Sequence, residues 1–252
     1  MLAEERFGDI LQLLGQKGTV SIQELCQRLD ASESTVRRDL LELHRQGRVN
    51  KVHGGATLPS GAFEAKEEPM LAKQHLAPAQ KERIARYAAT LINENDFVFI
   101  DAGSTTLCLA ECIDGAALRA SYVTSGIAHA RILAQKGCRV YVPAGRIRPS
   151  TEAIVGASTL HSLQKFNFTK SFVGANGVSL TAGYTTPDAE EAELKNTAVH
   201  RAREAWFLVD DSKFGKIYAA AICELTDASI ITNHLPDPRY GAHVFVKETE
   251  TL

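Results

Sequence analysis

The sequence lacks several features that mark specialised classes of protein. Its 252 residues include no apolar run long enough to cross a bilayer and no basic stretch followed by an apolar segment at the start, so we expect a cytoplasmic protein without membrane contact. The five cysteines are odd in number and form no C-x-x-C pair, which argues against a disulfide framework and a zinc site. The net charge is only −2, so any DNA-binding surface must depend on local charge.

The composition is that of an ordinary globular protein. Hydrophobic residues make up 44% of the chain and charged residues 23%, which is enough apolar material for a substantial core. The length favours one small and one mid-sized domain. We expect a small domain over residues 1–57, a linker over 58–78 and an α/β domain over 79–252.

Residues 1–57 carry the pattern of three short helices and a hairpin. The first helix shows apolar residues at helical spacing, and a Ser-x-x-Glu capping box at Ser21–Glu24 opens the second. Ser32 caps the third, which runs to about Arg45. The alternating stretch 48–56 with its Gly-Gly turn predicts a short β wing. Together these elements predict a winged helix-turn-helix.

The third predicted helix has residue types suited to reading DNA. Residues near the start of the second helix of a helix-turn-helix meet base edges in the major groove, where Ser, Thr and Arg can bond to phosphates or bases. Between residues 37 and 51 five basic residues face two acidic ones, although 1–57 holds eight of each sign. A salt-bridged, solvated surface is the alternative, and the helix-turn-helix spacing followed by a basic wing favours DNA. The candidate DNA contacts are Ser32, Ser34, Thr35, Arg37, Arg38, Arg48, Lys51 and His53.

Residues 58–78 have the proline and acidic content of a linker, with one helical turn near 70–75. From residue 79 onward, short apolar strands alternate with helices, which predicts a mostly parallel sheet covered on both faces. The expected strands are 97–101, 120–124, 139–143, 170–174, 205–209, 228–231 and 244–246. The expected helices are 80–93, one beginning near 107, 126–136, 156–165 and 188–203.

The loop after the first predicted strand has the composition of a phosphate cradle. The strand ends at Asp101, Gly103 allows close approach of a ligand, and three hydroxyl residues lead into a helix whose N-terminus favours an anion. Such Ser/Thr-rich turns are often only helix caps, and the two roles are compatible. Loops at the other strand ends add Arg and Lys for phosphate, and Asn and acidic groups for hydroxyls. The candidate effector-binding residues are Asp101, Gly103, Ser104, Thr105, Thr106, Thr124, Ser125, Arg146, Arg148, Asn176, Thr186, Glu190, Ser212 and Lys213.

No metal or other cofactor is expected. We expect three histidines to lie on helix surfaces and not to ligate a metal, because no second ligand follows any of them at i+3 or i+4. They are His129, His161 and His200. Catalytic residues are not assigned.

Several separate motifs resemble those of the DeoR family of bacterial sugar-metabolism repressors. They are S-E-S-T-V-R-R-D-L at 32–40, K-V-H-G-G-A at 51–56, D-A-G-S-T-T at 101–106, G-A-N-G at 174–177, T-T-P at 185–187 and D-S-K-F-G at 211–215. The resemblance covers nearly the whole chain. It implies a winged helix-turn-helix followed by a sensor domain similar to ribose-5-phosphate isomerase.

The resemblance to an isomerase raises the alternative of a sugar-phosphate isomerase activity in the C-terminal domain. In those enzymes a Gly-Ala-Asp loop carries acidic groups beside the sugar, and the matching position here is Asn176, whose amide is no general base at neutral pH. Lys213 resembles the isomerase lysine that meets the substrate. The sequence therefore favours binding without turnover, and we expect no enzyme.

The resemblance implies a repressor that binds double-stranded operator DNA as a dimer or tetramer and is released by a phosphorylated sugar. The run 148–156 and the turn at 174–177 look most like members that control fructose utilisation, which implies fructose 1-phosphate as the effector. Members that sense tagatose phosphates are close behind. The residues alone leave open which sugar phosphate binds, and whether it induces or co-represses.

Overall fold

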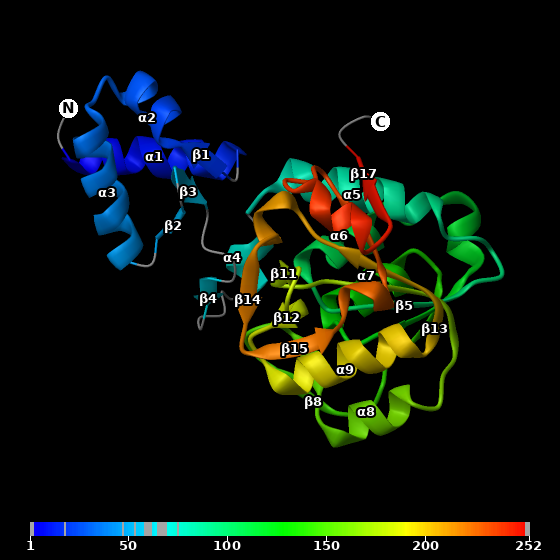
Figure 1. The fold of residues 1–252 in the computed structure, drawn as a ribbon. Coiled ribbons are helices and arrows are strands. Elements are labelled where there is room, and N and C mark those ends of the chain that lie inside the picture. The colour runs from blue at the N-terminus through cyan, green and yellow to red at the C-terminus, as the bar shows by residue number, and fades with distance from the viewer. Residues whose placement is uncertain are drawn as a thin grey trace. The chain divides into compact units, whose positions relative to one another are not determined.

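The computed structural model describes residues 3–17, 19–46, 48–52, 54–57, 62–64, 70–74 and 76–249 (Figure 1). The chain divides into two compact units, Met1–Ala62 and Phe63–Leu252. Among the described residues, no helix is long and apolar enough to cross a membrane. Each unit is considered by itself below.

The first unit is a winged helix-turn-helix, as the sequence predicts. Its helices are α1 (Ala3–Lys17), α2 (Ile22–Leu29) and α3 (Glu33–Arg45), and its strands are β1 (Thr19–Ser21), β2 (Asn50–Val52) and β3 (Gly55–Thr57). The strands form an antiparallel sheet in the order β1-β3-β2, and β1 is a strand that the sequence pattern did not indicate. Apolar side chains from all three helices fill one small core, which includes Leu14, Leu25 and Leu40.

Helix caps and one ion pair fix the helices of this unit. Ser21 Oγ accepts a hydrogen bond from Glu24 N at 3.2 Å, and Ser32 Oγ accepts one from Thr35 N at 3.3 Å. The turn between α2 and α3 closes at Asp30, whose φ of 47° ends α2. Arg6 on α1 donates to both carboxylate oxygens of buried Asp39 on α3, at 2.6 and 3.0 Å.

The second unit is built on a seven-stranded sheet in the order β17-β16-β13-β10-β5-β6-β7, and every neighbouring pair in it is parallel. Its strands are β5 (Phe97–Ile100), β6 (Ser121–Thr124), β7 (Arg139–Tyr141), β10 (Phe168–Val173), β13 (Ala202–Leu208), β16 (Ser229–Thr232) and β17 (Val246–Glu248). These match the seven strands expected from the sequence within a few residues, so the mostly parallel sheet is confirmed.

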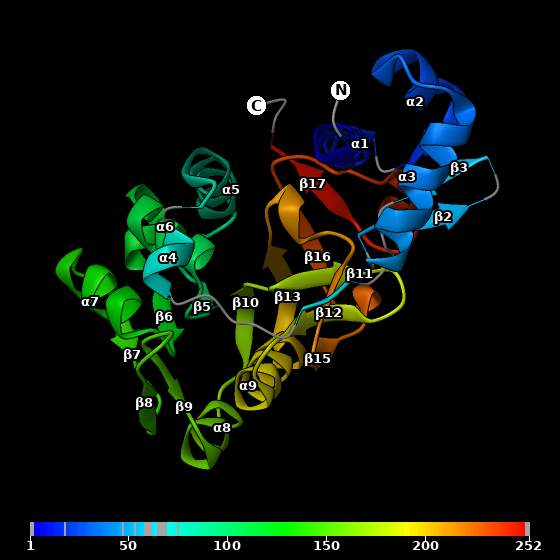
Figure 2. The ribbon, with the colours of Figure 1, turned by 90° about the vertical axis from the view of Figure 1, so that its left-hand side faces the viewer.

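Helices cover both faces of this sheet (Figure 2). On one face, Val98 and Ile100 of β5 pack in a core with residues of α5 (Pro78–Thr90), α6 (Ser104–Cys112) and α7 (Ile127–Gln135). On the other, Phe99 packs in a core with residues of α8 (Ala157–Leu163) and α9 (Ala189–His200). The alternation of side chains along one strand thus supplies both cores.

Short strands outside the main sheet were not expected from the sequence. They are β4 (Ala62–Glu64), β8 (Arg146–Arg148), β9 (Ala153–Val155), β11 (Gly177–Ser179), β12 (Gly183–Thr186), β14 (Lys216–Tyr218) and β15 (Ala220–Cys223). They form three small sheets, in the orders β8-β9, β11-β12-β15 and β14-β4. Short helical segments complete the unit: α4 (Met70–Gln74), η1 (Gly115–Arg119), η2 (Asp211–Lys213), η3 (Leu225–Asp227) and η4 (Pro238–Ala242). The expected linker over 58–78 therefore holds β4, α4 and the start of α5.

One expected surface residue is buried. His129, expected on the outside of a helix, is 1% exposed, because the first turn of α7 packs against the loop that begins α6. His161 and His200 are exposed, as expected. All five cysteines are free thiols.

Candidate functional site

The outer face of α3 presents the predicted DNA contacts. Val36, Leu40 and Leu43 point into the core, so the opposite side of the helix faces solvent. Ser34, Arg38, Leu41 and Arg45 follow one another at spacings of four, three and four residues, and all are exposed. Leu41 is 47% exposed and was not among the predicted contacts.

The arginines of α3 differ in their ion pairs. Arg37 Nη2 lies 2.5 Å from Glu33 Oε1 on the same helix, and Arg45 Nη1 lies 3.5 Å from Glu42 Oε2. Arg38 is exposed and has no ion pair within the part of the chain that the structure describes. The acidic residue next to it, Asp39, is already paired with Arg6. Among the arginines of α3, Arg38 therefore has the guanidinium that is most available for an external anion.

The hydroxyl residues at the start of α3 are mutually hydrogen-bonded. Ser32 Oγ lies 3.0 Å from Ser34 Oγ and 2.9 Å from Thr35 Oγ1. In the wing, Arg48 and Lys51 are exposed. His53 lies outside the described residues.

In the second unit, a cleft opens at the point where the strand order reverses. The chain leaves β5 toward β6 and β7, whereas β10 returns to the other side of β5, so the ends of β5 and β10 bound a topological switch point. The cleft measures about 630 Å³, including the solvent at its mouth. Its lining residues are Met70, Lys73, Leu76, Lys81, Ala102, Gly103, Ser104, Thr105, Thr151, Gly174, Ala175, Asn176, Glu191, Lys195, Leu208 and Lys213.

The N-terminus of α6 faces this cleft. Gly103 occupies the cap position and has no side chain to accept from the first amides of the helix, so the N–H groups of Ser104 and Thr105 have no partner within the helix. Ser104 is partly exposed and carries a hydroxyl at the same place. Amides, a hydroxyl and the positive end of a helix dipole together favour an anion.

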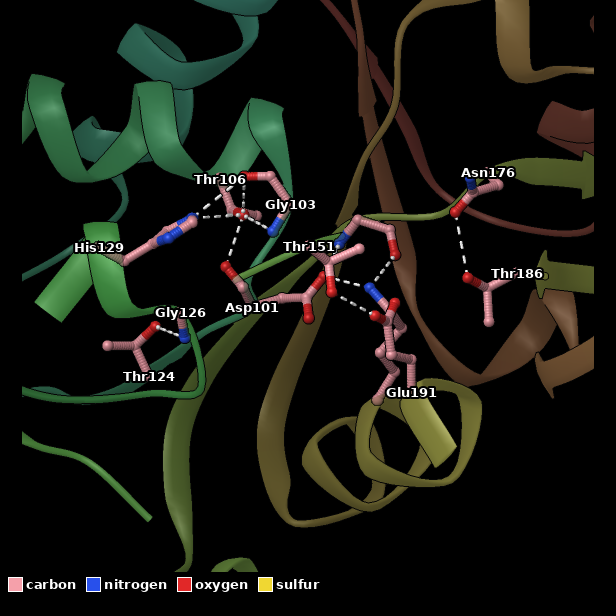
Figure 3. A network of polar contacts seen from close by, with 12 residues as sticks. Asp101, Gly103, Thr106, Thr124, Gly126, His129, Thr151, Asn176, Thr186 and Glu191 are labelled. Atoms are coloured by element: carbon pink, nitrogen blue, oxygen red, sulfur yellow. Dashed lines mark hydrogen bonds and ion pairs between the residues drawn. The ribbon is translucent and has the colours of Figure 1, made fainter. Parts of the chain in front are cut away.

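Buried side chains hold this loop in place (Figure 3). Thr106 Oγ1 accepts from Gly103 N at 2.9 Å and donates to the Asp101 carbonyl oxygen at 2.6 Å. His129 Nε2 lies 3.0 Å from the carbonyl oxygen of Gly103, which can only accept, so Nε2 carries the proton. Burial lowers the pKa of His129 to about 4, and the ring is therefore neutral near pH 7.

Four lysines surround the cleft. Lys195 on α9 is buried, and its ammonium binds the Asp101 carboxylate and, at 3.0 Å, the Gly174 carbonyl. Lys81 on α5 is 2% exposed, and its burial lowers the pKa of its amine. Lys213 Nζ stands 4.0 Å from Asp210 Oδ2, and Lys73 comes from α4. The side chains that line the cleft include these four cations and one carboxylate, Glu191, so an anionic ligand fits its charge.

Polar side chains suited to hydroxyls also line the cleft. Thr151 Oγ1 donates to Glu191 Oε1 at 2.8 Å, and Arg148 Nε lies 3.9 Å from the same oxygen, so the carboxylate of Glu191 is held at the cleft. Asn176 Oδ1 accepts from Thr186 Oγ1 at 3.1 Å, so the amide of Asn176 is fixed with its NH₂ group as a donor. A smaller cavity of about 210 Å³ beside the cleft is lined by Asp101, Ser125 and Glu191 among others.

Comparison with known proteins gives matches over both units. Residues 6–61 match the DeoR-like helix-turn-helix domain and residues 76–234 match the DeoR C terminal sensor domain. The chain belongs to the DeoR family. Its two domains make this DeoR-family chain a transcription regulator and not an enzyme.

Relatives of this DeoR-family chain are named as regulators or repressors. The chain is 40% identical over 233 residues to a regulator of Bacillus subtilis (strain 168) named "Uncharacterized HTH-type transcriptional regulator FruR", covering 92% of this chain and 91% of the relative. It is 34% identical over 240 residues to the lactose phosphotransferase system repressor of Staphylococcus aureus (strain N315), covering 94% of each. Among solved structures, ribose 5-phosphate isomerase A from Neisseria gonorrhoeae matches with a TM-score of 0.40 at 17% identity, over 57% of this chain and 55% of the isomerase.

The structure brings only some of the predicted effector residues to the cleft of the DeoR-family sensor domain. Those that line it are Gly103, Ser104, Thr105, Asn176 and Lys213, and those that line the adjoining cavity are Asp101 and Ser125. The others lie outside both linings and bond within the protein. Thr106 supports the loop, Thr124 Oγ1 accepts from Gly126 N at 3.1 Å, and Thr186 fixes Asn176.

The charged and hydroxyl residues of the remaining loops are also paired. Arg146 Nη2 lies 2.5 Å from Glu190 Oε2, both on the surface. Arg148 pairs with Asp188, and Ser212 Oγ donates to Asp210. Their part in ligand binding stays a prediction.

Several lining residues were missed from the sequence. Three of them lie on helices, where a charged residue is ordinarily expected to face solvent: Lys81 on α5, and Glu191 and Lys195 on α9.

A residue that supports the cleft was also missed. Asn233, buried after β16, exchanges two hydrogen bonds of 2.9 Å with Asp211 and so positions the loop that carries Lys213. A polar residue directly after a predicted strand was the signal that could have identified Asn233.

Proposed function

We propose that this DeoR-family regulator represses a carbohydrate-utilisation operon and is released from its operator by a phosphorylated sugar. The observation that carries the proposal is the cationic cleft at the α6 N-terminus, in a chain that also holds a helix-turn-helix. The amides and hydroxyls of Ser104 and Thr105, with Lys213 and Lys81, suit a phosphate. Glu191 and Asn176 suit sugar hydroxyls.

On the DNA side, α3 enters the major groove of a half-site. Arg38 and Ser34 face bases or phosphates, and exposed Leu41 on the same stripe can contact a thymine methyl group. Arg48 and Lys51 of the wing contact phosphates. A two-fold operator requires two copies of the chain, so the regulator acts as a homo-oligomer, a dimer or tetramer.

Fructose 1-phosphate is the proposed effector, with tagatose phosphates next. The support is the similarity to a regulator named FruR and to lactose phosphotransferase system repressors, together with the charge of the cleft. To release DNA, the effector must bind the DNA-incompetent state of the regulator more tightly than the competent one.

A thermal-shift screen with fructose 1-phosphate, fructose 6-phosphate, tagatose phosphates, ribose 5-phosphate and unphosphorylated fructose tests the ligand. The expected result is a rise in Tm with one phosphosugar and none with fructose. Binding to the promoter region of the chain's own operon is then measured by fluorescence anisotropy with and without that phosphosugar. Equal affinity for the promoter fragment and a random duplex, in both conditions, contradicts the proposal.

A further inference from the structure

Exposed apolar side chains collect at one end of the main sheet. Of the eight large apolar side chains that are exposed in the described parts of the chain, four lie on elements at the β7 end of this sheet (Figure 2). They are between 37% and 56% exposed, and we call them the edge patch: Ile127 of α7, Tyr141 of β7, Val142 directly after it, and Ile147 of β8. Single exposed apolar residues are ordinary, whereas a group of them marks an interaction surface.

Backbone hydrogen bonds hold the elements of the edge patch together. Strand β7 pairs with β6, so Val142 lies level with the end of β6, from which the chain turns into α7. The β8–β9 hairpin is bonded to the same turn. Ile127 N donates to the Glu152 carbonyl oxygen at 3.1 Å, and Ile154 N donates to the Ser125 carbonyl oxygen at 2.7 Å. The patch is therefore a fixed surface of the sensor domain.

Strand β7 is also an open edge of the sheet. It pairs with β6 on one side and with no described strand on the other. The free N–H and C=O groups of such an edge can pair with a further strand. At the opposite edge, β17 is half-buried at all three positions, and only Phe245 beside it is a large exposed apolar residue in the described structure. The open backbone and the apolar surface coincide at β7.

The three residues of β7 are complementary to themselves. In an antiparallel pair of two β7 strands centred on Val140, Arg139 of each copy lies opposite Tyr141 of the other. Both side chains stand on the same face of the sheet, because they are two residues apart. Arg139 is exposed and makes no ion pair among the described residues, so its guanidinium is available to the Tyr141 ring as a cation–π partner.

The rim of the edge patch carries charges of both signs. Arg139 and Arg146 are exposed, and so are Glu152 and Glu190. A two-fold interface places a surface against its own copy, so a rim of a single sign would repel itself. The mixed rim and the self-complementary strand therefore fit a second copy of this chain.

We propose that two copies of this chain associate through β7 and the edge patch, with the two β7 strands paired antiparallel about Val140. The choice of a second copy as the partner rests on the proposed function, because a two-fold operator requires two copies. A stable interface buries roughly 800 Å² of each partner, which is more than a strand of three residues offers. Ile127 and Ile147 therefore belong to the contact together with β7.

A cysteine at the centre of the strand tests the register in the full-length protein. In Val140→Cys the two introduced thiols lie directly opposite each other, with a Cα separation of about 4.5–5.5 Å that a disulfide can bridge. Mild oxidation is expected to give a cross-linked dimer on a non-reducing gel. Val246→Cys is the matched control, since Val246 is also a half-buried valine on an edge strand. It is expected to remain uncross-linked, as is the unmodified protein with its five free thiols.

A charge in the edge patch tests the interface without a cross-link. Analytical ultracentrifugation of the unmodified protein over a range of concentrations is expected to show a dimer. Val142→Arg places a buried cation in each half of the interface and is expected to raise the dimer dissociation constant about tenfold or more. Phe245→Arg, at the opposite edge of the sheet, is the matched control and is expected to leave it unchanged. Thermal unfolding of both variants checks that the fold is kept.

The outcomes separate this inference from the proposed function. A Val140→Cys protein that stays uncross-linked, or a folded Val142→Arg protein that dimerises as tightly as the unmodified one, overturns the interface, although operator binding and its release by a phosphosugar stand. Cross-linking of Val246→Cys in place of Val140→Cys also overturns it. If the β7 cross-link forms and Val142→Arg weakens the dimer, but no promoter fragment is preferred over random duplex, the interface stands and the proposed function fails.

Discussion

His129 Nε2 lies 3.0 Å from the Gly103 carbonyl oxygen and thereby joins the first turn of α7 to the loop that begins α6. The same nitrogen lies 3.2 Å from Thr106 Oγ1. The other ring nitrogen, Nδ1, is buried without a hydrogen-bond partner among the described residues, and Gly126 stands so close that an added Cβ would lie 2.3 Å from it. The site therefore holds a neutral imidazole. Among the described residues, no acceptor is in place to bind a proton added at Nδ1.

This arrangement predicts a stability that falls in mild acid. Because the pKa of His129 is lowered from 6.5 to about 4 on folding, the unfolded chain binds the extra proton first, and stability is lost as the pH falls from 6.5 toward 4. The contribution of this one group over that window is about 3 kcal/mol. Denaturant unfolding at several pH values should show a shallower acid loss in His129→Gln than in the unmodified protein.

The control for this experiment is His161→Gln, which changes an exposed histidine. It is expected to keep the full acid dependence. Equal slopes for His129→Gln and the unmodified protein between pH 6.5 and 4 would show that the imidazole is not the responsible group.

The main sheet could be predicted from the sequence because its strands are apolar and separated by amphipathic helices. Strand β5, with Phe97 to Ile100, is buried from Val98 onward and flanked by α5 and α6. The small antiparallel strands gave no such pattern. Strands β11 and β12 are only three and four residues long and are buried at every position. Neither strand has an exposed face, so the alternation of apolar and polar residues that marks a half-buried strand is missing.

The candidate site could be predicted only where it follows a strand end. Gly103, Ser104 and Lys213 were found because a Gly/Ser/Thr loop and a Ser-Lys pair stand after expected strands. Lys81 and Lys195 were missed because burial of a lysine depends on packing between helices distant in the sequence. The expected roles of Arg146 and Glu190 overlooked their pairing with each other, which only the folded β8 and α9 reveal.

Arg38 is expected to contribute more to operator binding than any neutral position of α3. Replacing Arg38 by Ala removes an exposed guanidinium that has no ion pair in the described structure, and should weaken binding about tenfold or more. If Arg38 contacts a phosphate, the slope of log affinity against log salt should fall by about one. Fluorescence anisotropy at several salt concentrations measures both, with Arg83→Ala on α5 as an exposed control. Unchanged affinity in Arg38→Ala would remove α3 from the interface as described.

Substitution of Lys213 or Ser104 should leave operator binding intact and weaken the release of operator DNA by the effector. Lys213→Ala or Ser104→Ala removes a proposed phosphate contact and should weaken phosphosugar binding by about tenfold, since charge-assisted hydrogen bonds contribute about 1.5–3 kcal/mol. Operator binding without effector should stay unchanged, because both residues lie in the sensor unit. Calorimetry and operator release assays measure the two properties. Full inducibility of Lys213→Ala at normal effector concentration would show that the site is misassigned.

Two substitutions of Ser32 distinguish its role as the cap of α3 from a contact with DNA. Its hydroxyl caps α3 through Thr35 N, and Asp is an equally good N-cap residue, so Ser32→Asp should change the free energy of unfolding by less than about 0.5 kcal/mol. Ser32→Ala should lower the free energy of unfolding by about 1 kcal/mol, because the cap is lost.

The same substitutions test the contact with DNA. If Ser32 lies against a phosphate, the added carboxylate of Ser32→Asp should abolish operator binding although the fold is intact. Urea unfolding and anisotropy on the same samples measure the two effects, and Ser21→Asp at the cap of α2 is the matched control. Operator binding by Ser32→Asp at the strength of the unmodified protein would place the start of α3 away from the DNA backbone.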